Sequence, residues 1–466
     1  MFLTQKIYFI GIGGIGMSAI AEILHHKGFK ILGSDKIKNN ITNGLKRKGI
    51  KIFHSHKKDN IKDIDIIVHS TAIKKNNIEL LEARRLKIPI YSRAMMLAEV
   101  MRLKPSITVA GSHGKTTTTS LISNIFESAG HDPTVINGGI INNFGANAKL
   151  GKGTFIIAEA DESDGSFTLL PSTIGIINNI DLEHIDFYKN LNEIKRRFIE
   201  YANRIPFYGF LSICNDDKNT RSIIKYLQSK PLITFGIKEV SNFRAKNIRV
   251  LKNFSSIFDL EINFEKKKII KNISVPLIGE HNILNTLCAI SIAFQLKIPM
   301  KKISQGLLNF SGVKRRFSIL YKKNNNLVID DYGHHPKEIK STVNSLKTIT
   351  KNKIIAIFEP HRYSRLNKFI NEFINSFSKA DHIYILPIYS AGEKNSKKID
   401  NIKLSKIFEK KYKNKKIYAS NNEKLMFRSL KELLVKNNNF IFLGAGSSSQ
   451  IAHRFVNYLN SNVKNF

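Results

Sequence analysis

Two glycine-rich loops, each between an apolar run and a helical pattern, constrain this chain more than any other feature. The first follows Ile7 to Ile10 and spans Gly11 to Gly16, and the second follows Ile107 to Ala110 and spans Gly111 to Lys115. Glycines at a strand-to-helix turn let backbone N–H groups approach a phosphate at the helix N-terminus. The sequence therefore predicts an α/β protein with two phosphate-binding strand-helix units.

The first loop has the spacing G-x-G-x-x-G, and its glycines are candidates for contacting a pyrophosphate: Gly11, Gly13, Gly14 and Gly16. Asp35 ends the next apolar stretch, where a carboxylate can bond a ribose hydroxyl. Taken alone, this pattern favours an NAD-dependent dehydrogenase. The same loop suits any diphosphate, UDP included, and a tight structural turn is the remaining alternative.

The second loop is a P-loop in which Gly111 replaces the usual earlier glycine. Its backbone N–H groups and the Lys115 ammonium would hold the β- and γ-phosphates of ATP or GTP, while the Thr116 hydroxyl would reach Mg²⁺. A γ-phosphate cradle has no use in hydride transfer, so this loop argues against the dehydrogenase. The predicted contacts are Gly111, Ser112, His113, Gly114, Lys115, Thr116 and Thr117.

Carboxylates follow the apolar run Phe155 to Ala158, where they would face the metal of a P-loop nucleotide. They are Glu159, Asp161, Glu162 and Asp164. One of them is expected to hold magnesium. For Asp161 and Asp164 the alternative is an acidic loop exposed to solvent. His184, which lies beside Glu183 further along, is either a capping histidine or another metal ligand.

Two more polar clusters follow apolar runs, at Asp330 to Pro336 and at His361 to Arg365. The second cluster carries Arg362 and Arg365 three residues apart. Such a pair suits a carboxylate or a phosphate, because the planar guanidinium binds either with two N–H groups. The alternative interpretation is that these are exposed surface residues with no role in binding.

Composition narrows the class of protein. At 466 residues, with 42% hydrophobic and 24% charged residues, the chain is expected to be globular with about three domains. No apolar run is long enough to span a bilayer, and two cysteines without metal spacing suit a reducing compartment, so a cytoplasmic protein is expected. The net charge of +37 is spread along the chain, and we attribute it to genome composition rather than to nucleic-acid binding.

Ordered motifs along the whole chain resemble those of the Mur ligases, in particular of the members that add L-alanine. They are GIGGIGMS from Gly11, GSHGKTTT from Gly111, AEADESDGSF from Ala158, GEHNILN from Gly279, GVKRRF from Gly312, DDYGHHP from Asp330, PHRYSR from Pro360 and GAGS from Gly444.

This resemblance implies three α/β domains: a Rossmann-like UDP-binding domain at residues 1–104, a P-loop ATPase-like domain with a mainly parallel sheet at 105–311, and a Rossmann-like domain at 312–466 that closes over ATP and the amino acid. It implies ATP-dependent ligation of L-alanine to the lactoyl carboxylate of UDP-N-acetylmuramate through an acyl phosphate, a step of peptidoglycan precursor synthesis. ATP and Mg²⁺, with Mn²⁺ as the alternative metal, are the expected cofactors. No nucleic-acid partner is expected, and the chain would be a monomer or a homodimer.

The resemblance also assigns residues. Lys115 looks like the phosphate-binding lysine, with Thr116, Glu159 and His184 as the metal set. The remaining nucleotide contacts are Asn282, Arg316 and Asp331. The UDP-sugar contacts are the glycines of the first loop with Asp35, Ser70, Thr71, Asn147 and Ala148. The alanine contacts are Tyr332, His334, Arg362 and Arg365, and His184 and His334 are the two candidates for the catalytic base.

Two features limit these assignments. The family usually shows a Thr-Asn-Ile-Glu-x-Asp-His run, whereas this chain has Glu183 before His184, and the modified lysine of sister ligases has no clear equivalent here.

The nearest rival is the recycling ligase that adds a tripeptide to the same sugar nucleotide. That enzyme resembles DDFAHHP and EPRSN, whereas this chain has DDYGHHP and EPHRYSR.

Overall fold

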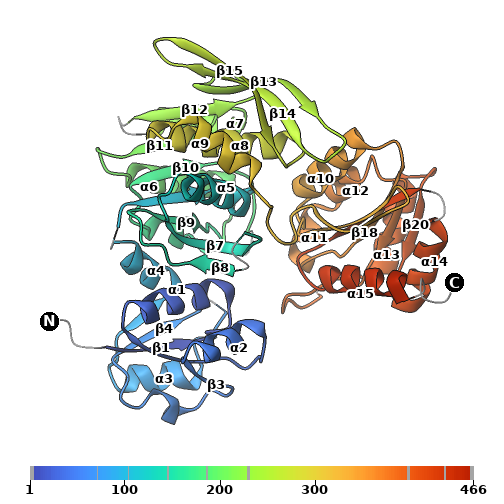
Figure 1. The fold of residues 1–466 in the computed structure, drawn as a ribbon. Helices are drawn as coiled ribbons and strands as arrows, with labels where there is room; N and C mark the ends of the chain where they lie inside the picture. Colours follow the sequence, from blue (N-terminus) through green and yellow to red (C-terminus); the bar gives the residue numbers. More distant parts are fainter. Residues whose placement is uncertain are drawn as a thin grey trace. The chain divides into compact units, whose positions relative to one another are not determined.

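Three β-sheets organise the chain (Figure 1). The structure is a computed structural model that describes residues 5–70, 72–102, 104–143, 146–184, 187–227, 231–395, 399–434 and 437–461, without the side chains of 146 and 147. Contacts divide the chain into two compact units. The first comprises Met1–Lys246, Asp259–Ile273 and Leu284–Ser311, and the second comprises Asn247–Phe258, Ser274–Ile283 and Gly312–Phe466.

The first sheet has the strand order β3-β2-β1-β4-β5, and its strand pairs are parallel. Its strands are β1 (Lys6–Ile10), β2 (Lys30–Ser34), β3 (Lys51–Phe53), β4 (Ile66–His69) and β5 (Ile90–Ser92), with α1 (Ile15–His26), α2 (Asn40–Arg47), η1 (Lys58–Ile61), α3 (Ile78–Arg85) and α4 (Arg93–Met101). Because side chains alternate along a strand, Ile7 and Phe9 join the core around α1, whereas Tyr8 and Ile10 join the core beside α3. The chain order reverses on either side of β1, so a ligand crevice is expected at its carboxyl end.

The second sheet has the order β15-β14-β13-β12-β11-β10-β6-β9-β7-β8. Its strands are β6 (Ser106–Ala110), β7 (Thr134–Ile141), β8 (Ala146–Lys149), β9 (Ile156–Ala160), β10 (Ile174–Ile177), β11 (Phe210–Cys214), β12 (Leu232–Gly236), β13 (Phe243–Val250), β14 (Ser256–Asn263) and β15 (Lys267–Val275). Its helices are α5 (Lys115–Ser128), η2 (Ser166–Leu169), α6 (Leu191–Asn203), α7 (Lys218–Ile223), η3 (Ile224–Tyr226), α8 (Glu280–Gln295) and α9 (Met300–Leu308). β6 pairs in parallel with β9 and with β10. The loops that follow these three strands therefore gather at one edge of the sheet.

The third sheet has the order β16-β17-β21-β18-β19-β20, parallel except for the β16–β17 pair. Its elements are β16 (Ser318–Lys323), β17 (Asn326–Asp331), α10 (Pro336–Ile349), β18 (Lys353–Phe358), α11 (Tyr363–Lys368), α12 (Ile370–Ser376), β19 (His382–Ile385), α13 (Asn401–Lys411), β20 (Lys416–Ala419), α14 (Glu423–Leu434), β21 (Asn438–Leu443) and α15 (Ser448–Ser461). Alternate residues of β18 again enter two cores, Ala356 beside α10 and α12, and Ile355 beside α14 and α15.

The turn from β21 into α15 is a third glycine-containing loop, and a carboxylate of the chain itself fills it. Glu359 accepts hydrogen bonds from the backbone N–H groups of Gly446 at 3.1 Å, Ser447 at 2.9 Å and Ser448 at 3.1 Å. Its charge therefore lies at the N-terminus of α15, where the helix dipole favours an anion.

The predicted fold class is confirmed, since all three sheets are mainly parallel and are accompanied by helices. The strands predicted next to the motifs are present within about two residues of their predicted ends. Each sheet lies inside one of the three predicted domains, although contacts group the first sheet with most of the second. Among the described residues, no helix has the length and apolar character needed to cross a membrane.

Candidate active site

The loop between β6 and α5 depends on its glycines. Gly111 has φ of 141° and Gly114 has φ of 80°, values that residues with side chains rarely adopt. A Cβ added at Gly114 would also lie only 2.5 Å from the amide oxygen of Asn285. The loop can therefore bring its backbone close to a ligand at the start of α5.

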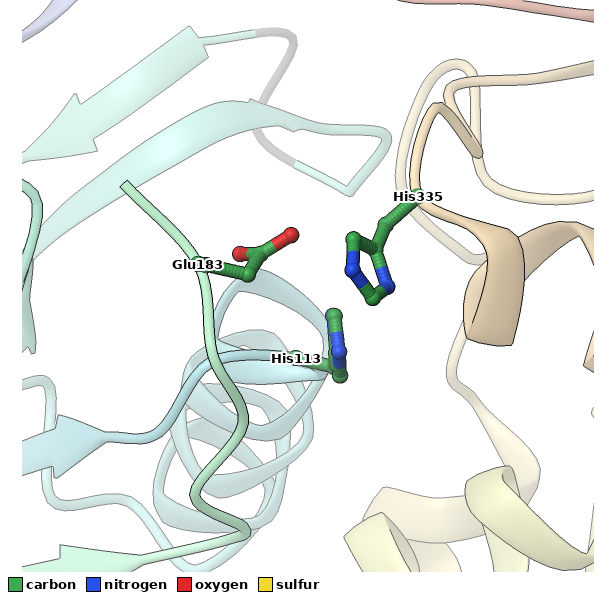
Figure 2. A group of neighbouring side chains, drawn as sticks. All are labelled: His113, Glu183 and His335. Atoms are coloured by element: carbon green, nitrogen blue, oxygen red, sulfur yellow. The ribbon is translucent and has the colours of Figure 1, made fainter. Parts of the chain in front are cut away.

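Hydrogen bonds fix this loop to the segment that follows β10. The backbone N–H of His113 donates to the side-chain oxygen of Asn179 at 2.8 Å, and the N–H of Asp181 donates to the hydroxyl of Ser112 at 2.8 Å. His113 Nε2 lies 3.0 Å from a carboxylate oxygen of Asp181. Figure 2 shows His113 and Glu183 extending from these neighbouring segments, and their nearest ligating atoms lie within 4.8 Å of each other.

Lys115 occupies the centre of an acidic pocket. Its Nζ donates to the backbone oxygen of Gly111 at 2.7 Å and to the carboxylate of Glu162 at 2.7 Å. The Glu162 side chain is only 2% exposed. Burial alone would lower the pKa of Lys115, but the charges of Glu162 and Asp161 outweigh it and raise that pKa. Lys115 is therefore cationic throughout the physiological pH range.

Two more carboxylates surround this pair. Glu159 accepts a hydrogen bond from the N–H of Gly138 at 2.8 Å, and burial raises its pKa although Lys115 and the neighbouring Thr116 side chain oppose that rise. Burial also disfavours the charged form of Asp161, but Lys115 and Arg93 outweigh that effect and lower its pKa. Of the predicted metal set, Thr116 and Glu159 thus lie close together.

His184, the third predicted metal ligand, lies on the other side of Glu162. Its Nε2 is 3.4 Å from a Glu162 oxygen and 3.8 Å from a Glu183 oxygen. Burial would lower its pKa, but these two carboxylates raise it. Ligating atoms of Glu162, Glu183 and His184 lie within 4.8 Å of one another. Carboxylate oxygens suit Mg²⁺ or Mn²⁺, so Glu162 and Glu183 join the candidates.

The first glycine loop is held by the ends of its neighbouring strands. The N–H of Gly11 donates to the Ser34 oxygen at 2.8 Å, and the N–H of Gly13 donates to the Asp35 carboxylate at 2.8 Å. A Cβ at Gly11 would lie 3.2 Å from the Cβ of Ser70. The structure thus brings together the glycines, Asp35 and Ser70 at the carboxyl edge of the first sheet.

The structure describes only part of the remaining predicted sugar-nucleotide contacts. Thr71 and the side chain of Asn147 lie outside the described residues. Ala148 lies on β8, where it pairs with Ile136.

Arg93 is a functional candidate that the sequence analysis missed. Its Nη2 lies 3.4 Å from an Asp161 oxygen, and a Cβ added at Gly16 would lie 3.1 Å from its Nη1. Arg93 therefore stands between the first glycine loop and the acidic cluster. A lone arginine after Ser92 carries no motif, so only the fold reveals this position.

In the second unit, Asp331 and Arg316 lie near Tyr332. Asp331 accepts hydrogen bonds from the N–H groups of Phe317 and Gly333, each at 2.8 Å, and burial raises its pKa. The guanidinium of Arg316 lies 5.2 Å from the centre of the Tyr332 ring. Asn282, at the start of α8, donates its side-chain N–H to the Ile278 oxygen at 2.9 Å.

The predicted alanine contacts also gather in this unit. The rings of His334 and His361 lie 5.6 Å apart, and Arg365 Nη1 lies 3.3 Å from His361 Nδ1. Burial lowers the pKa of His334 to about 3 and that of His361 to about 4, the latter with help from Arg365. Both rings are neutral at pH 7. Arg362 has φ of 69° and Nη1 3.8 Å from Glu393, an acid to which the sequence assigned no role.

Family comparisons cover nearly the whole chain. Residues 6–105 match the description "Mur ligase family, catalytic domain", residues 109–293 match "Mur ligase middle domain", and residues 315–446 match "Mur ligase, glutamate ligase domain". The three matches follow the three sheets in order.

Individual relatives agree with these matches. The UDP-N-acetylmuramate–L-alanine ligase of Rickettsia felis is 45% identical over 98% of this chain and 97% of its own length. The crystal structure of the UDP-N-acetylmuramate-alanine ligase MurC from Thermotoga maritima is 28% identical, covers 98% of this chain and all of its own, and superposes with a TM-score of 0.80. A murein peptide ligase from Psychrobacter arcticus has a TM-score of 0.70 at 21% identity, over 97% of this chain and 98% of its own, a likeness of fold alone.

Proposed function

The chain belongs to the Mur ligase family, and we propose that it uses ATP to join L-alanine to the lactoyl carboxylate of UDP-N-acetylmuramate. The products are UDP-N-acetylmuramoyl-L-alanine, ADP and phosphate. The 45% sequence identity to an L-alanine ligase over 98% of this chain carries this assignment. The P-loop lysine within an acidic pocket supports it. ATP and the sugar nucleotide are cytoplasmic metabolites, and we place the reaction in the cytoplasm.

We propose the following sites. Residues 1–104, 105–311 and 312–466 form the UDP-binding, ATP-binding and amino-acid domains. Gly111 to Thr117 bind the ATP phosphates, and Asn282, Arg316 and Asp331 contact the nucleotide. The first glycine loop binds the UDP diphosphate with Asp35 and Ser70, and Arg362 and Arg365 bind the alanine carboxylate.

The first chemical step activates a poor electrophile. A carboxylate oxygen of the substrate attacks the γ-phosphorus of ATP, the bond to the β-phosphate oxygen breaks, and ADP leaves. Lys115 stabilises the negative charge on the phosphoryl oxygens, and it must exchange its bond to Glu162 for one to the phosphate. Mg²⁺, held by Thr116, Glu159 and His184, would neutralise the same charge.

The second step forms the amide bond. The neutral amine of alanine attacks the acyl carbon, and phosphate leaves. The ammonium of free alanine must first lose a proton. His334, with its pKa lowered to about 3, is a weak proton acceptor, whereas the carboxylates around His184 make that residue a stronger one. A His184 that coordinates metal through Nε2 cannot accept a proton at that atom, so its two expected roles are alternatives.

The test is a phosphate-release assay with ATP, Mg²⁺ and UDP-N-acetylmuramate, with one amino compound added at a time. L-alanine should give the fastest release. Glycine lacks one methyl group, which in an apolar pocket is worth about 1 to 3 kcal/mol, so it should be slow but detectable. Faster turnover with L-alanyl-γ-D-glutamyl-diaminopimelate than with L-alanine would refute the proposal in favour of the recycling ligase.

A further inference from the structure

The first unit contains an open cleft that none of the sites above uses. It has a volume of about 890 Å³ and lies along α6 and the α7–η3 segment. Its lining includes Lys195 and Arg196 from α6, and Arg221, Lys225 and Tyr226 from the opposite wall. No acidic residue is among the residues that line it. The cleft therefore has four cationic side chains on two facing walls.

The cations of α6 belong to one face of the helix. Asn192, Lys195, Arg196 and Ile199 follow the i, i+3, i+4, i+7 spacing that places side chains on one side. The opposite side carries Phe198 and other buried residues that join the core of the unit. The fold thus fixes the direction of these charges.

The two cations of α6 are also poorly compensated. On the same helix, Arg197 pairs with Glu200 at 2.9 Å. Lys195 and Arg196, by contrast, make no ion pair or side-chain hydrogen bond within the described part of the chain. Arg221 lies 3.3 Å from Glu239 and also donates to the backbone oxygen of Asn215. Concentrated positive charge in a concave surface attracts anions.

Hydrogen bonds hold both walls in place. The Tyr201 hydroxyl of α6 donates to the Thr108 oxygen on β6 at 3.1 Å, and the Asn219 side chain of α7 donates to the Ile180 oxygen at 2.7 Å. A cleft with fixed walls needs little ordering when a ligand binds. The cleft is therefore formed before any ligand arrives.

We propose that this cleft binds a nucleoside polyphosphate as a second nucleotide site, separate from the P-loop and from the first glycine loop. The cations on the two walls contact the phosphates. Tyr226 is 58% exposed, and its ring, with the Lys225 Nζ 5.0 Å from its centre, offers an aromatic surface on which a base can stack. The volume falls within the range of about 300 to 1,000 Å³ typical of small-molecule sites, which favours a single nucleotide over a nucleic-acid strand.

The experiment titrates a fluorescent N-methylanthraniloyl-GDP into the full-length protein and follows anisotropy. Wild type is compared with the double variant Lys195→Ala/Arg196→Ala and, for the other wall, with Arg221→Ala/Lys225→Ala. The matched control is Lys301→Ala/Lys302→Ala, which removes the same charge from two adjacent exposed positions on α9. Circular dichroism melts check that each variant is folded.

In both cleft variants the fluorescent nucleotide should bind the cleft at least tenfold more weakly than in wild type. In the control variant its binding to the cleft should be unchanged. Binding to the cleft should weaken as NaCl is raised, because salt screens the cations. Isotherms of the cleft variants that superimpose on wild type would overturn the proposal. So would a single-stranded oligonucleotide that binds wild type more tightly than the nucleotide does and is lost in the cleft variants, since the ligand would then be a nucleic acid.

Discussion

Replacing Lys115 by methionine leaves the buried carboxylate of Glu162 without its cation. The two groups are 2.7 Å apart, and the Glu162 side chain is 2% exposed. Removing one partner of a buried ion pair costs about 3 to 5 kcal/mol of folding free energy. His184 lies 3.4 Å from the other Glu162 oxygen and can supply a replacement positive charge. We therefore expect Lys115→Met to lose about 3 kcal/mol of folding free energy, near the lower end of that range.

A second variant separates this stability effect from catalysis. Lys115→Met/Glu162→Gln removes the stranded charge, so it should be clearly more stable than Lys115→Met. Both variants should lose at least a hundredfold in ligation rate, because each lacks the cation that stabilises the transferred phosphoryl group. The chain has no tryptophan, so urea unfolding is best followed by circular dichroism and phosphate release by a coupled assay.

A comparison of the stabilities of the two variants provides an internal check on this reasoning. A Lys115→Met protein as stable as wild type at pH 8, or a double variant no more stable than the single one, would refute the claim that Glu162 is buried and charged.

The remaining predictions concern both units. Burial lowers the pKa of His334 from 6.5 to about 3, so folding stability should fall as pH drops from 7 towards 3, by about 2 kcal/mol at pH 5 from this group, in urea titrations. The variant His334→Gln should show a flatter profile. Arg365→Lys keeps the charge but loses the planar fork, so the KM for L-alanine should rise at least tenfold more than the KM for ATP. Gly114→Ala places a Cβ 2.5 Å from Asn285 in a backbone with φ of 80°, so ATP binding should be lost in calorimetry. Without alanine, hydroxylamine should trap an activated muramoyl carboxylate, detected by mass spectrometry.

Each of these has a control and a contrary outcome. Equal pH profiles for wild type and His334→Gln would mean that this ring titrates normally. Equal rises of both KM values in Arg365→Lys would remove the alanine assignment. Gly130→Ala is the matched control for Gly114, because its φ is 82° but no atom lies within 4 Å of the added Cβ. If Gly130→Ala loses ATP binding as fully as Gly114→Ala does, backbone strain alone explains the loss of binding. Repeated failure to trap the carboxylate would argue against an acyl phosphate.

The sequence predicted those parts of the site that depend on local chain geometry. A glycine loop between a strand and a helix has one favourable arrangement, so Gly111 to Lys115 and Gly11 to Gly16 could be placed before the fold was known. Acids at the carboxyl end of β9 and just beyond it had to lie at the same edge as the loop after β6, because carboxyl ends of parallel neighbours meet there. Glu159 was assigned by this reasoning together with the family resemblance.

What the sequence could not predict are the pairings across elements. Nothing local shows that Lys115 bonds Glu162, two residues beyond the end of β9, rather than Glu159, which lies within β9. Arg93 reaches Asp161 from the start of α4, far away in the sequence. The low pKa of His334 comes from burial, which depends on packing in the whole unit. These contacts are long-range and carry no periodic signal.

The loop at the start of α15 shows how a chain can occupy an anion-binding turn with one of its own side chains. Three N–H groups at a helix N-terminus, a position that can bind phosphate in other proteins, are here bonded to Glu359, a side chain from the neighbouring strand end. The chain thus carries a tethered surrogate anion at effectively unlimited local concentration, and a soluble phosphate would have to displace it. Truncating that one side chain would convert a structural plug into an empty anion receptor, which makes this loop a natural starting point for engineering a new nucleotide site.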